Sequence, residues 1–338
     1  MYRTLVAVLI AVGLSACSPR PAPMIDLSGP AQGTMYSIKI AAPPAGIDAH
    51  AVRLVIDDVL QRIDLQMSGY RPDSEISRFN QSRSTSWVAV STDVASVVAL
   101  AKSVSEASAG ALDITVAPLV DLWGMGPAGE LKSVPSDADI ARVRVSVGFQ
   151  LLEVRMNPPA LRKVLPDVTV DLNAVAQGYT VDVMAQRFAA AGLTDFMIDV
   201  GGEVKAQGHN ASGQLWRIAI ERPINTDPQP YAIAQLDNSA ISTSGEYRHF
   251  VDRNGHRYSH TIDPRTGRPV QHSLASVAVV AATAADADAW STALNVLGET
   301  EGYALARQRG VAALFITDRN GALESRMTPA MEKYVGGK

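Results

Sequence analysis

The sequence contains a single cysteine, Cys17, among its 338 residues. One cysteine excludes an internal disulfide, and it also excludes a metal site built from several thiolates. If Cys17 is acylated, no free thiol remains, which is compatible with an oxidising compartment.

The chain also lacks an excess of positive charge. It has 30 Lys and Arg against 34 Asp and Glu, for a net charge of −4. Removing residues 1–16 removes one cation, Arg3, and no acid, so the net charge becomes −5. Because no basic run appears, the sequence predicts no nucleic-acid partner and no attraction to anionic lipid beyond an acyl anchor.

The apolar run at the N-terminus, Leu5 to Leu14, is too short for a typical membrane-spanning helix. With Arg3 before it and Leu14-Ser15-Ala16-Cys17 at its end, it predicts a signal peptide over residues 1–16. The ending resembles a bacterial lipobox, in which Cys17 becomes the lipidated first residue. An ordinary secreted protein with a stray cysteine is the alternative.

A lipidated Cys17 predicts a lipoprotein of the bacterial cell envelope that faces the periplasm from the inner or the outer membrane. Ser18 replaces the aspartate that usually retains lipoproteins in the inner membrane, which favours the outer one. Residues 17–30 include a Pro-rich stretch and predict a semi-rigid tether. Residues 31–338 are expected to form the folded domain.

Strands and helices follow one another without regular βαβ alternation, and no fixed-period repeat is visible. Alternation and β-branched residues predict strands over 34–40, 168–170, 196–200, 216–221, 240–245, 276–282 and 311–317. Apolar spacing and caps predict helices over 52–67, 91–110, 171–192 and 283–298, with a short one after Ser136. Residues 70–80 and 111–127 are expected to be loops. The order predicts an α+β fold with mixed or antiparallel sheets and packed helices.

The segment from Tyr258 to Gly267 contains a polar turn, Asp263-Pro-Arg-Thr-Gly267, preceded by His260. Asp263-Pro264 is typical of a turn start, and Gly267 can adopt a positive φ where the turn closes. The turn is expected to present an imidazole, a carboxylate and a guanidinium close together, beside a phosphate. A hairpin connection with charged decoration is the alternative.

The helix that follows carries Asp288 and Thr292. Residues four apart lie on the same face of a helix. A carboxylate and a hydroxyl on one face suit a hard cation such as Mg²⁺, although such pairs are also common on helix surfaces. Together with the turn, the pair predicts metal-assisted chemistry on a phosphoester or phosphoanhydride.

Polar residues also collect where predicted strands end. Each has an ordinary interpretation as a cap or turn, but glycines let backbone approach a ligand and helix N-termini favour phosphate. These segments are Asp171-Leu-Asn173, Gly201-Gly-Glu203 and Thr243-Ser-Gly245.

Several linked motifs, in order from about Gly33 to the C-terminus, resemble the ApbE family of FAD:protein FMN transferases, which are often periplasmic lipoproteins. The motifs span residues 67–80, 111–127, 171–178, 200–203 and 260–267. The resemblance implies a two-lobed α+β fold. It also implies an enzyme that needs Mg²⁺, cleaves the FAD pyrophosphate, attaches FMN through a phosphoester to a Thr or Ser of a target protein, and releases AMP.

The resemblance further implies site residues by motif position. The expected FAD contacts are Gln32, Tyr70, Ala111, Leu112, Asp113, Asp171, Gln177 and Ile262. The expected metal contacts are the Ala174 carbonyl, Asp288 and Thr292. His260 falls where the family has a histidine next to the pyrophosphate, so His260 and Asp288 are the expected catalytic residues. His260 is either the base for the acceptor hydroxyl or a hydrogen-bond donor to phosphate.

Some positions depart from the family pattern. Gln32 stands where Met is usual, and Gln177 stands where Lys is common, so one cation near the phosphates is missing. Gly69, Ile114 and Asp121 replace a hydroxyl residue, a Pro and an Asn. None of these positions is an expected metal ligand.

Three other functions share part of this evidence. The first is a pyrophosphatase that splits FAD into FMN and AMP, with water replacing the acceptor hydroxyl. The second is a non-catalytic flavin-binding lipoprotein, which would have no need of the Asp288 and Thr292 pair. The third is a solute-binding lipoprotein, a class that usually shows regular βαβ alternation. For the transferase, the expected partners are FAD and a flavin-acceptor protein, such as a redox-pump subunit.

Overall fold

The structure is a computed structural model that describes residues 23–126, 133–224, 229–245, 250–253 and 256–336. The predicted signal peptide and Cys17 lie outside the described residues. Within the described part of the chain, no helix combines the length and apolar character needed to cross a membrane.

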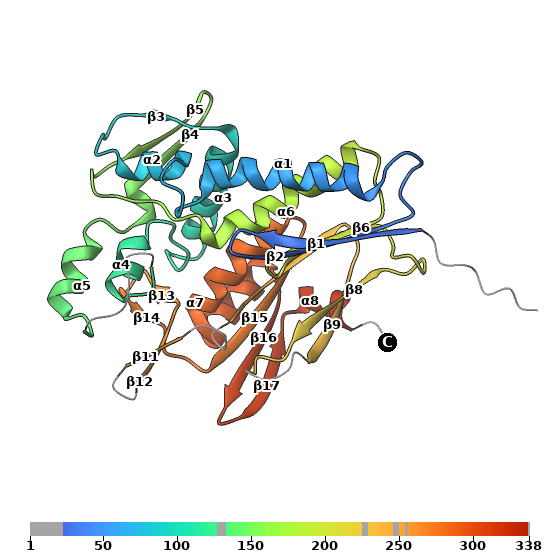
Figure 1. Cartoon of the computed structure of the whole chain (residues 1–338). Helices are drawn as coiled ribbons and strands as arrows, with labels where there is room; N and C mark the ends of the chain where they lie inside the picture. Colours follow the sequence, from blue (N-terminus) through green and yellow to red (C-terminus); the bar gives the residue numbers. More distant parts are fainter. Residues whose placement is uncertain (1–22, 127–132, 225–228, 246–249, 254–255, 337–338) are drawn as a thin grey trace, which may run out of the picture.

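An eight-stranded sheet runs through the molecule, and every neighbouring pair in it is antiparallel. Its strands, in spatial order, are β1 (Met24–Ala31), β2 (Thr34–Ala41), β6 (Phe196–Val200), β7 (Glu203–Gln207), β10 (Ser239–Gly245), β15 (Leu274–Ala281), β16 (Ala312–Arg319) and β17 (Ala322–Met327). Because the helices pack on this antiparallel sheet, the predicted α+β class is confirmed (Figure 1).

One face of the sheet is covered by α6 (Asn173–Ala190) and α7 (Ala284–Arg309), with α1 (Ala49–Met67) packed on α6 (Figure 1). Phe188 packs edge-on against Phe196 of the sheet, at 5.6 Å between ring centroids. The other face is covered by the hairpin of β8 (Trp216–Glu221) and β9 (Pro230–Leu236) and by α8 (Pro329–Val335). The sheet therefore has a buried layer of apolar side chains on each side.

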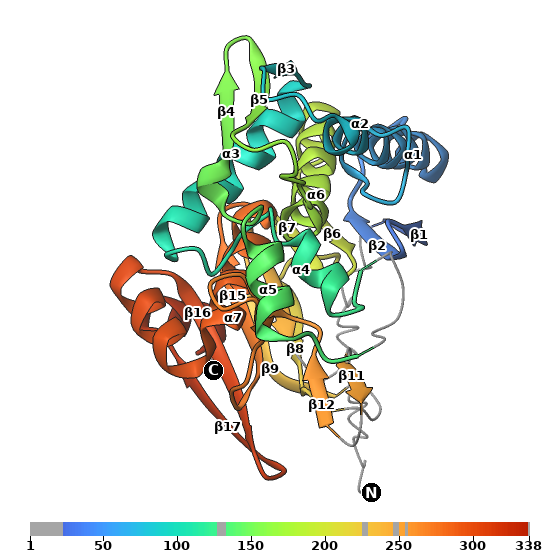
Figure 2. The same ribbon diagram turned by 90° about the vertical axis from the view of Figure 1, so that its left-hand side faces the viewer.

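The remaining elements gather at one end of the molecule, on the left in Figure 1 and facing the viewer in Figure 2. The helices are α2 (Glu75–Gln81), α3 (Thr92–Ala107), α4 (Ala117–Leu122), α5 (Asp137–Arg144) and the 3-10 turn η1 (Phe149–Leu151). The strands are β3 (Val88–Ala89), β4 (Leu152–Met156), β5 (Pro159–Lys163), β11 (Phe250–Arg253), β12 (His256–Ser259), β13 (Ile262–Asp263) and β14 (Arg268–Pro269).

The predicted helix starts are confirmed where a side chain supplies the cap. Ser91, Ser136 and Thr283 each accept a hydrogen bond from the backbone N–H three residues on, and these bonds begin α3, α5 and α7.

The predicted tether extends too far toward the domain. Residues 24–31 form β1, in which buried Ile25 and Leu27 alternate with exposed residues. The strand pairs with β2 through a tight turn at Gln32-Gly33. The folded domain therefore begins before residue 31.

Two local predictions were wrong. Val168–Val170 is not a strand, because the backbone N–H and C=O of Val170 bond to the side-chain amide of Asn80, at 2.8 Å each. The segments 70–80 and 111–127, predicted as loops, are partly helical, because they overlap the short helices α2 and α4. The predicted helix end at Gly298 is confirmed, since Gly298 has a non-helical φ of 73° and ψ of −175°; a second helical segment, which the sequence did not predict, follows to Arg309 within α7.

Candidate functional site

The site is built where α6 crosses the start of α7. A Cβ at Gly178 would lie 2.4 Å from the carbonyl oxygen of Ala284, so only glycine allows this close approach. Asp182 of α6 accepts hydrogen bonds at 2.9 Å from the backbone N–H groups of Ala284 and Ala285. The first turn of α7 is therefore fixed against the middle of α6.

This crossing places Asp288 beside the first turns of α6. Asp288 is only 5% exposed, and its Oδ2 accepts a hydrogen bond from the Gly178 N–H at 3.2 Å. Burial raises the pKa of its carboxyl to about 7. No ion pair within the described residues neutralises this carboxylate, so it is a buried acid with spare acceptor capacity.

Two adjoining cavities are lined by every residue predicted to contact FAD, to bind the metal or to act in catalysis. The first, here called the Asp288 cavity, has a volume of about 450 Å³. Its lining includes Ala111, Leu112, Asp113, Asp171, Ala174, Gln177, His260, Ile262, Asp288 and Thr292. The second, the Tyr70 cavity, has a volume of about 540 Å³ and includes Gln32, Tyr70 and Gln177. Asn173 and Gln177 line both cavities, so the two spaces adjoin at the start of α6.

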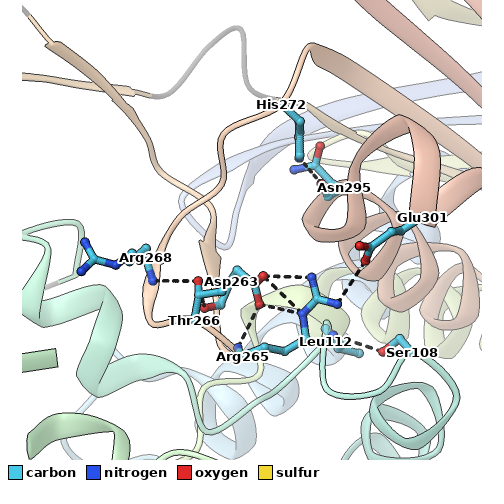
Figure 3. A network of polar contacts seen from close by, with 9 residues as sticks. All are labelled: Ser108, Leu112, Asp263, Arg265, Thr266, Arg268, His272, Asn295 and Glu301. Carbon is cyan, nitrogen blue, oxygen red and sulfur yellow. Dashed lines mark hydrogen bonds and ion pairs between the residues drawn. The ribbon is translucent and has the colours of Figure 1, made fainter. Parts of the chain in front are cut away.

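The polar turn is confirmed, but its charged side chains do not serve the cavity as expected. The guanidinium of Arg265 donates to both carboxylate oxygens of Asp263 at 2.9–3.2 Å and reaches Glu301 at 3.4 Å (Figure 3). Gly267 has a φ of 73°, and its carbonyl accepts a hydrogen bond from the Trp123 indole at 2.9 Å. The carboxylate and the guanidinium therefore stabilise the turn, while half-buried His260 lines the Asp288 cavity.

The turn is also tied to α7. The side-chain amide of Asn295 donates to the Thr261 hydroxyl at 3.3 Å. The backbone carbonyl of Asn295 contacts Nε2 of His272 at 2.8 Å (Figure 3). Asn295 and Thr261 line the same cavity as Thr292 and His260. The helix that carries Asp288 and Thr292 thus also holds the segment that carries His260.

Asp113 is buried, and its carboxylate is fully engaged by the chain. It accepts hydrogen bonds from the N–H and hydroxyl of Thr115 at 2.8 and 2.6 Å and from the Phe149 N–H at 2.7 Å. Burial raises the pKa of Asp113, and these bonds oppose the rise. The side chain shapes the cavity wall, and contact with a ligand is left mainly to its backbone.

Asp171 and Gln177 stand on either side of the first turn of α6. Asp171 accepts a hydrogen bond from the Asn173 N–H at 2.9 Å, and burial raises the pKa of its carboxyl. A Cβ at Gly201 would lie 3.0 Å from Nε2 of Gln177 and 2.8 Å from Thr34, which explains the glycine after β6.

A buried polar cluster lies next to Asp288. The sequence did not predict that these residues contact one another. Glu203 is 7% exposed, and burial together with the neighbouring Asp288 raises its pKa well above the ordinary value. Ser291, beside Thr292, bonds to the hydroxyls of Ser242 and Ser244 at 3.1 and 2.9 Å. The polar strand ends at Glu203 and Ser244 were the signal for this cluster.

Asp64 of α1, on the wall of the Tyr70 cavity, had no signal in the sequence. An acid on the polar side of an amphipathic helix looks the same whether it faces solvent or a cavity.

Among the described residues, no cluster of three or more His, Cys, Asp or Glu could hold a metal ion. A cation near Asp288 would therefore depend on neutral oxygen ligands, such as the Thr292 hydroxyl and the Ala174 carbonyl.

Comparison with known proteins identifies the family of the chain. The FAD:protein FMN transferase of Vibrio cholerae serotype O1 is 38% identical over 335 residues, which cover 99% of both chains. The solved flavin transferase ApbE from Vibrio cholerae superposes with a TM-score of 0.85 at 38% identity, covering 93% of this chain and all of that one. The apo form of Pseudomonas stutzeri flavinyl transferase ApbE gives 0.86 at 35% identity, covering 95% and 99%. Because residues 32–315 also match the ApbE family, the chain belongs to that family.

Proposed function

We propose that this protein is an FAD:protein FMN transferase, which cleaves FAD and attaches FMN to a hydroxyl of an acceptor protein. Relatives with that activity in their names align with 99% of the chain. One observation carries the proposal: two cavities adjoin at Asn173 and Gln177, and the buried carboxylate of Asp288, which has no cation partner among the described residues, lines one of them. Such a site suits a dinucleotide, with a ring system in each cavity and the pyrophosphate between them.

The residues around Asp288 fit Mg²⁺. A carboxylate, a hydroxyl and a backbone carbonyl are oxygen ligands of the kind that this cation prefers, and Asp288, Thr292 and Ala174 supply them on one cavity wall. Mg²⁺ bound there would offset the charge of the pyrophosphate. We infer that Asp288 stays buried without a cation partner in the protein because that partner arrives with the substrate.

The chain's own groups would then position the reaction. The acceptor hydroxyl oxygen forms a bond to the flavin-side phosphorus, the anhydride P–O bond breaks, and AMP leaves. His260 stands on the same cavity wall as Thr292 and can accept the proton of that hydroxyl. Asn295, through Thr261, holds the His260 segment to the helix of Asp288. Positioning of this kind supplies most of the catalysis in phosphoryl transfer.

One incubation tests the activity: purified protein, FAD, Mg²⁺ and a flavin-acceptor domain, followed by mass spectrometry of the acceptor. A covalent FMN adduct is the expected result. Free FMN and AMP without an adduct would instead identify an FAD pyrophosphatase, and no turnover would identify a flavin-binding protein. A parallel reaction in EDTA tests the requirement for a divalent cation.

We further propose that Cys17 is lipidated and anchors the protein at the periplasmic side of the cell envelope, with the outer membrane favoured by Ser18. The signal-peptide pattern of residues 1–16 supports this location. Cys17→Ser should release the protein into the soluble periplasmic fraction or leave it unprocessed. A normally processed variant that still fractionates with membranes would contradict the anchor.

A further inference from the structure

Gln32 has an unusual backbone conformation at the edge of the Tyr70 cavity. It occupies the two-residue turn between β1 and β2, where Gln32 and Gly33 have φ values of 47° and 77°. Tight turns with two positive φ values favour Asn, Asp and Gly. A glutamine with a positive φ destabilises the turn locally, which indicates that its side chain has a function.

The Gln32 side chain is fixed between two helices. Its Nε2 donates to the hydroxyl of Thr180 on α6 at 2.9 Å. That hydroxyl in turn donates to the Ala176 carbonyl at 2.7 Å, so it can only accept from Gln32. The amide orientation is therefore determined, and the amide contributes to the same cavity wall as Asp64 of α1.

Asp64 has acceptor capacity that the described chain does not use. Its half-buried carboxylate forms no ion pair within the described residues. Burial raises its pKa, while the charge of Arg71 and hydrogen bonding by Gln32 oppose that rise. Arg71 does not neutralise it directly, because the guanidinium is bound to Asp73 at 3.1 and 2.8 Å.

The rest of the cavity suits the flat face of a ring. Ile63, Met67 and Tyr70 contribute apolar and aromatic surface, and the Tyr70 side chain is 70% exposed and free to stack. A carboxylate at the edge of such a cavity selects a ring that presents an N–H group there.

We propose that Asp64 is a specificity-determining residue that accepts a hydrogen bond from an N–H group on the edge of one ring system of FAD. The inference rests on the proposed function, which makes FAD the substrate. FAD offers this chemistry twice, at the exocyclic amino group of adenine and at N3–H of the isoalloxazine. An analogue that lacks the N–H leaves the carboxylate without its donor, which is how polar sites reject close analogues.

The test measures displacement of bound FAD by two matched pairs of competitors. The first pair is AMP against purine riboside 5′-monophosphate, which lacks the amino group and has no N–H on that edge, and the second is FMN against N3-methyl-FMN. The proteins are wild type, Asp64→Asn, and Asp57→Asn as a control. Asp57 is exposed on the same helix, so its variant makes the same charge change away from the cavity. Wild type and Asp57→Asn should prefer the N–H-bearing member of one pair by about ten- to a hundredfold, the range for a hydrogen bond to a charged group. Asp64→Asn should reduce that preference severalfold, because a neutral amide oxygen accepts a weaker hydrogen bond than a carboxylate does, and the pair affected identifies the ring.

Two results would overturn the inference. One is a wild type that discriminates in neither pair, and the other is an Asp64→Asn variant that discriminates as wild type does. Thermal melting of the three proteins detects a folding defect. A misfolded variant would also bind both members of the other pair more weakly, whereas a variant that has lost only the hydrogen bond would bind them as wild type does. If wild type transfers FMN from FAD under either result, the proposed function stands and only the role of Asp64 fails.

Discussion

Asp263 and Asp288 are both buried carboxylates, 25 residues apart in the chain, yet their surroundings are opposite. Asp263 is 8% exposed and Asp288 is 5% exposed, so burial does not separate them. Asp263 is neutralised by Arg265 in a bidentate pair, whereas Asp288 has one backbone donor and no cation in the described chain. The difference shows that an acid with a partner supports the fold, and an acid without one is available for a ligand.

The largest effect should follow removal of the Asp288 charge. Asp288→Asn keeps the shape of the side chain but removes the proposed charged metal ligand, so Mg²⁺-dependent flavin transfer should fall below detection. The melting temperature without metal should not decrease. Wild-type turnover of this variant at limiting Mg²⁺ would contradict the assignment.

His260→Ala should reduce turnover by about 10²–10⁴-fold if the imidazole is the base. Affinity for FAD should change little, because proton transfer occurs only in the transition state. The measurement is turnover and FAD affinity side by side. Weakened FAD affinity with nearly normal turnover would make His260 a phosphate donor instead, and no change in either would make it a turn residue.

The pH dependence of stability should report the burial of Asp288. The pKa of Asp288 is about 7 in the folded protein against an ordinary 3.8, so the folded state keeps a proton that the unfolded state releases. Its contribution to stability is therefore greatest below about pH 4 and is lost as the pH rises to about 7.

In EDTA, the melting temperature of wild type should be lower at pH 8 than at pH 5. The same difference should be smaller in Asp288→Asn. If the melting temperature depends on pH equally in wild type and in Asp288→Asn, the Asp288 carboxyl is not the cause of that dependence.

Asp263→Asn should affect stability more than chemistry. Breaking a fully buried pair costs about 3–5 kcal/mol, but the Arg265 side chain is 33% exposed, so about 2 kcal/mol is expected here. In a protein of this size, that lowers the melting temperature by roughly 3 °C. Turnover of Asp263→Asn, measured well below its melting temperature, should stay within several-fold of the wild-type value. If the variant is folded but has no activity, Asp263 takes part in the reaction.

The smallest effect should come from Thr292→Val, which removes a neutral ligand with little change in volume. Losing one oxygen ligand should raise the Mg²⁺ concentration for half-maximal activity about tenfold, equivalent to about 1.4 kcal/mol. Saturating Mg²⁺ should restore turnover. A variant that Mg²⁺ does not rescue would show that Thr292 acts other than through the metal.

The sequence predicted what depends on local periodicity. Asp288 and Thr292 share a helix face because four residues make about one turn, and Thr283 caps that helix with a side chain three residues from its target. His260 and the FAD-contact positions came from motif resemblance, and the structure gathers all of them around two cavities.

What the sequence did not predict depends on partners that are distant along the chain. The pairing of Arg265 with Glu301 joins residues 36 apart, and the Val170 backbone bonds to Asn80, 90 residues earlier. Asp64 faces a cavity only because α1 lies over α6 and the β1–β2 turn inserts Gln32 beside it. Neither hydrophobic period nor turn chemistry carries that information.

The contact between Gly178 and Ala284 limits how this protein can vary by mutation. Every codon change away from glycine adds a Cβ, and at position 178 that atom would meet a backbone carbonyl at 2.4 Å rather than a movable side chain. By contrast, a Cβ at Gly69 would have no atom within 4 Å, so a substitution there should destabilise the protein little. In a library of all single substitutions selected for flavin transfer, position 178 should tolerate none, although it bears no chemical group of its own. Its function is to be small enough that two helices meet and Asp288 reaches the start of α6.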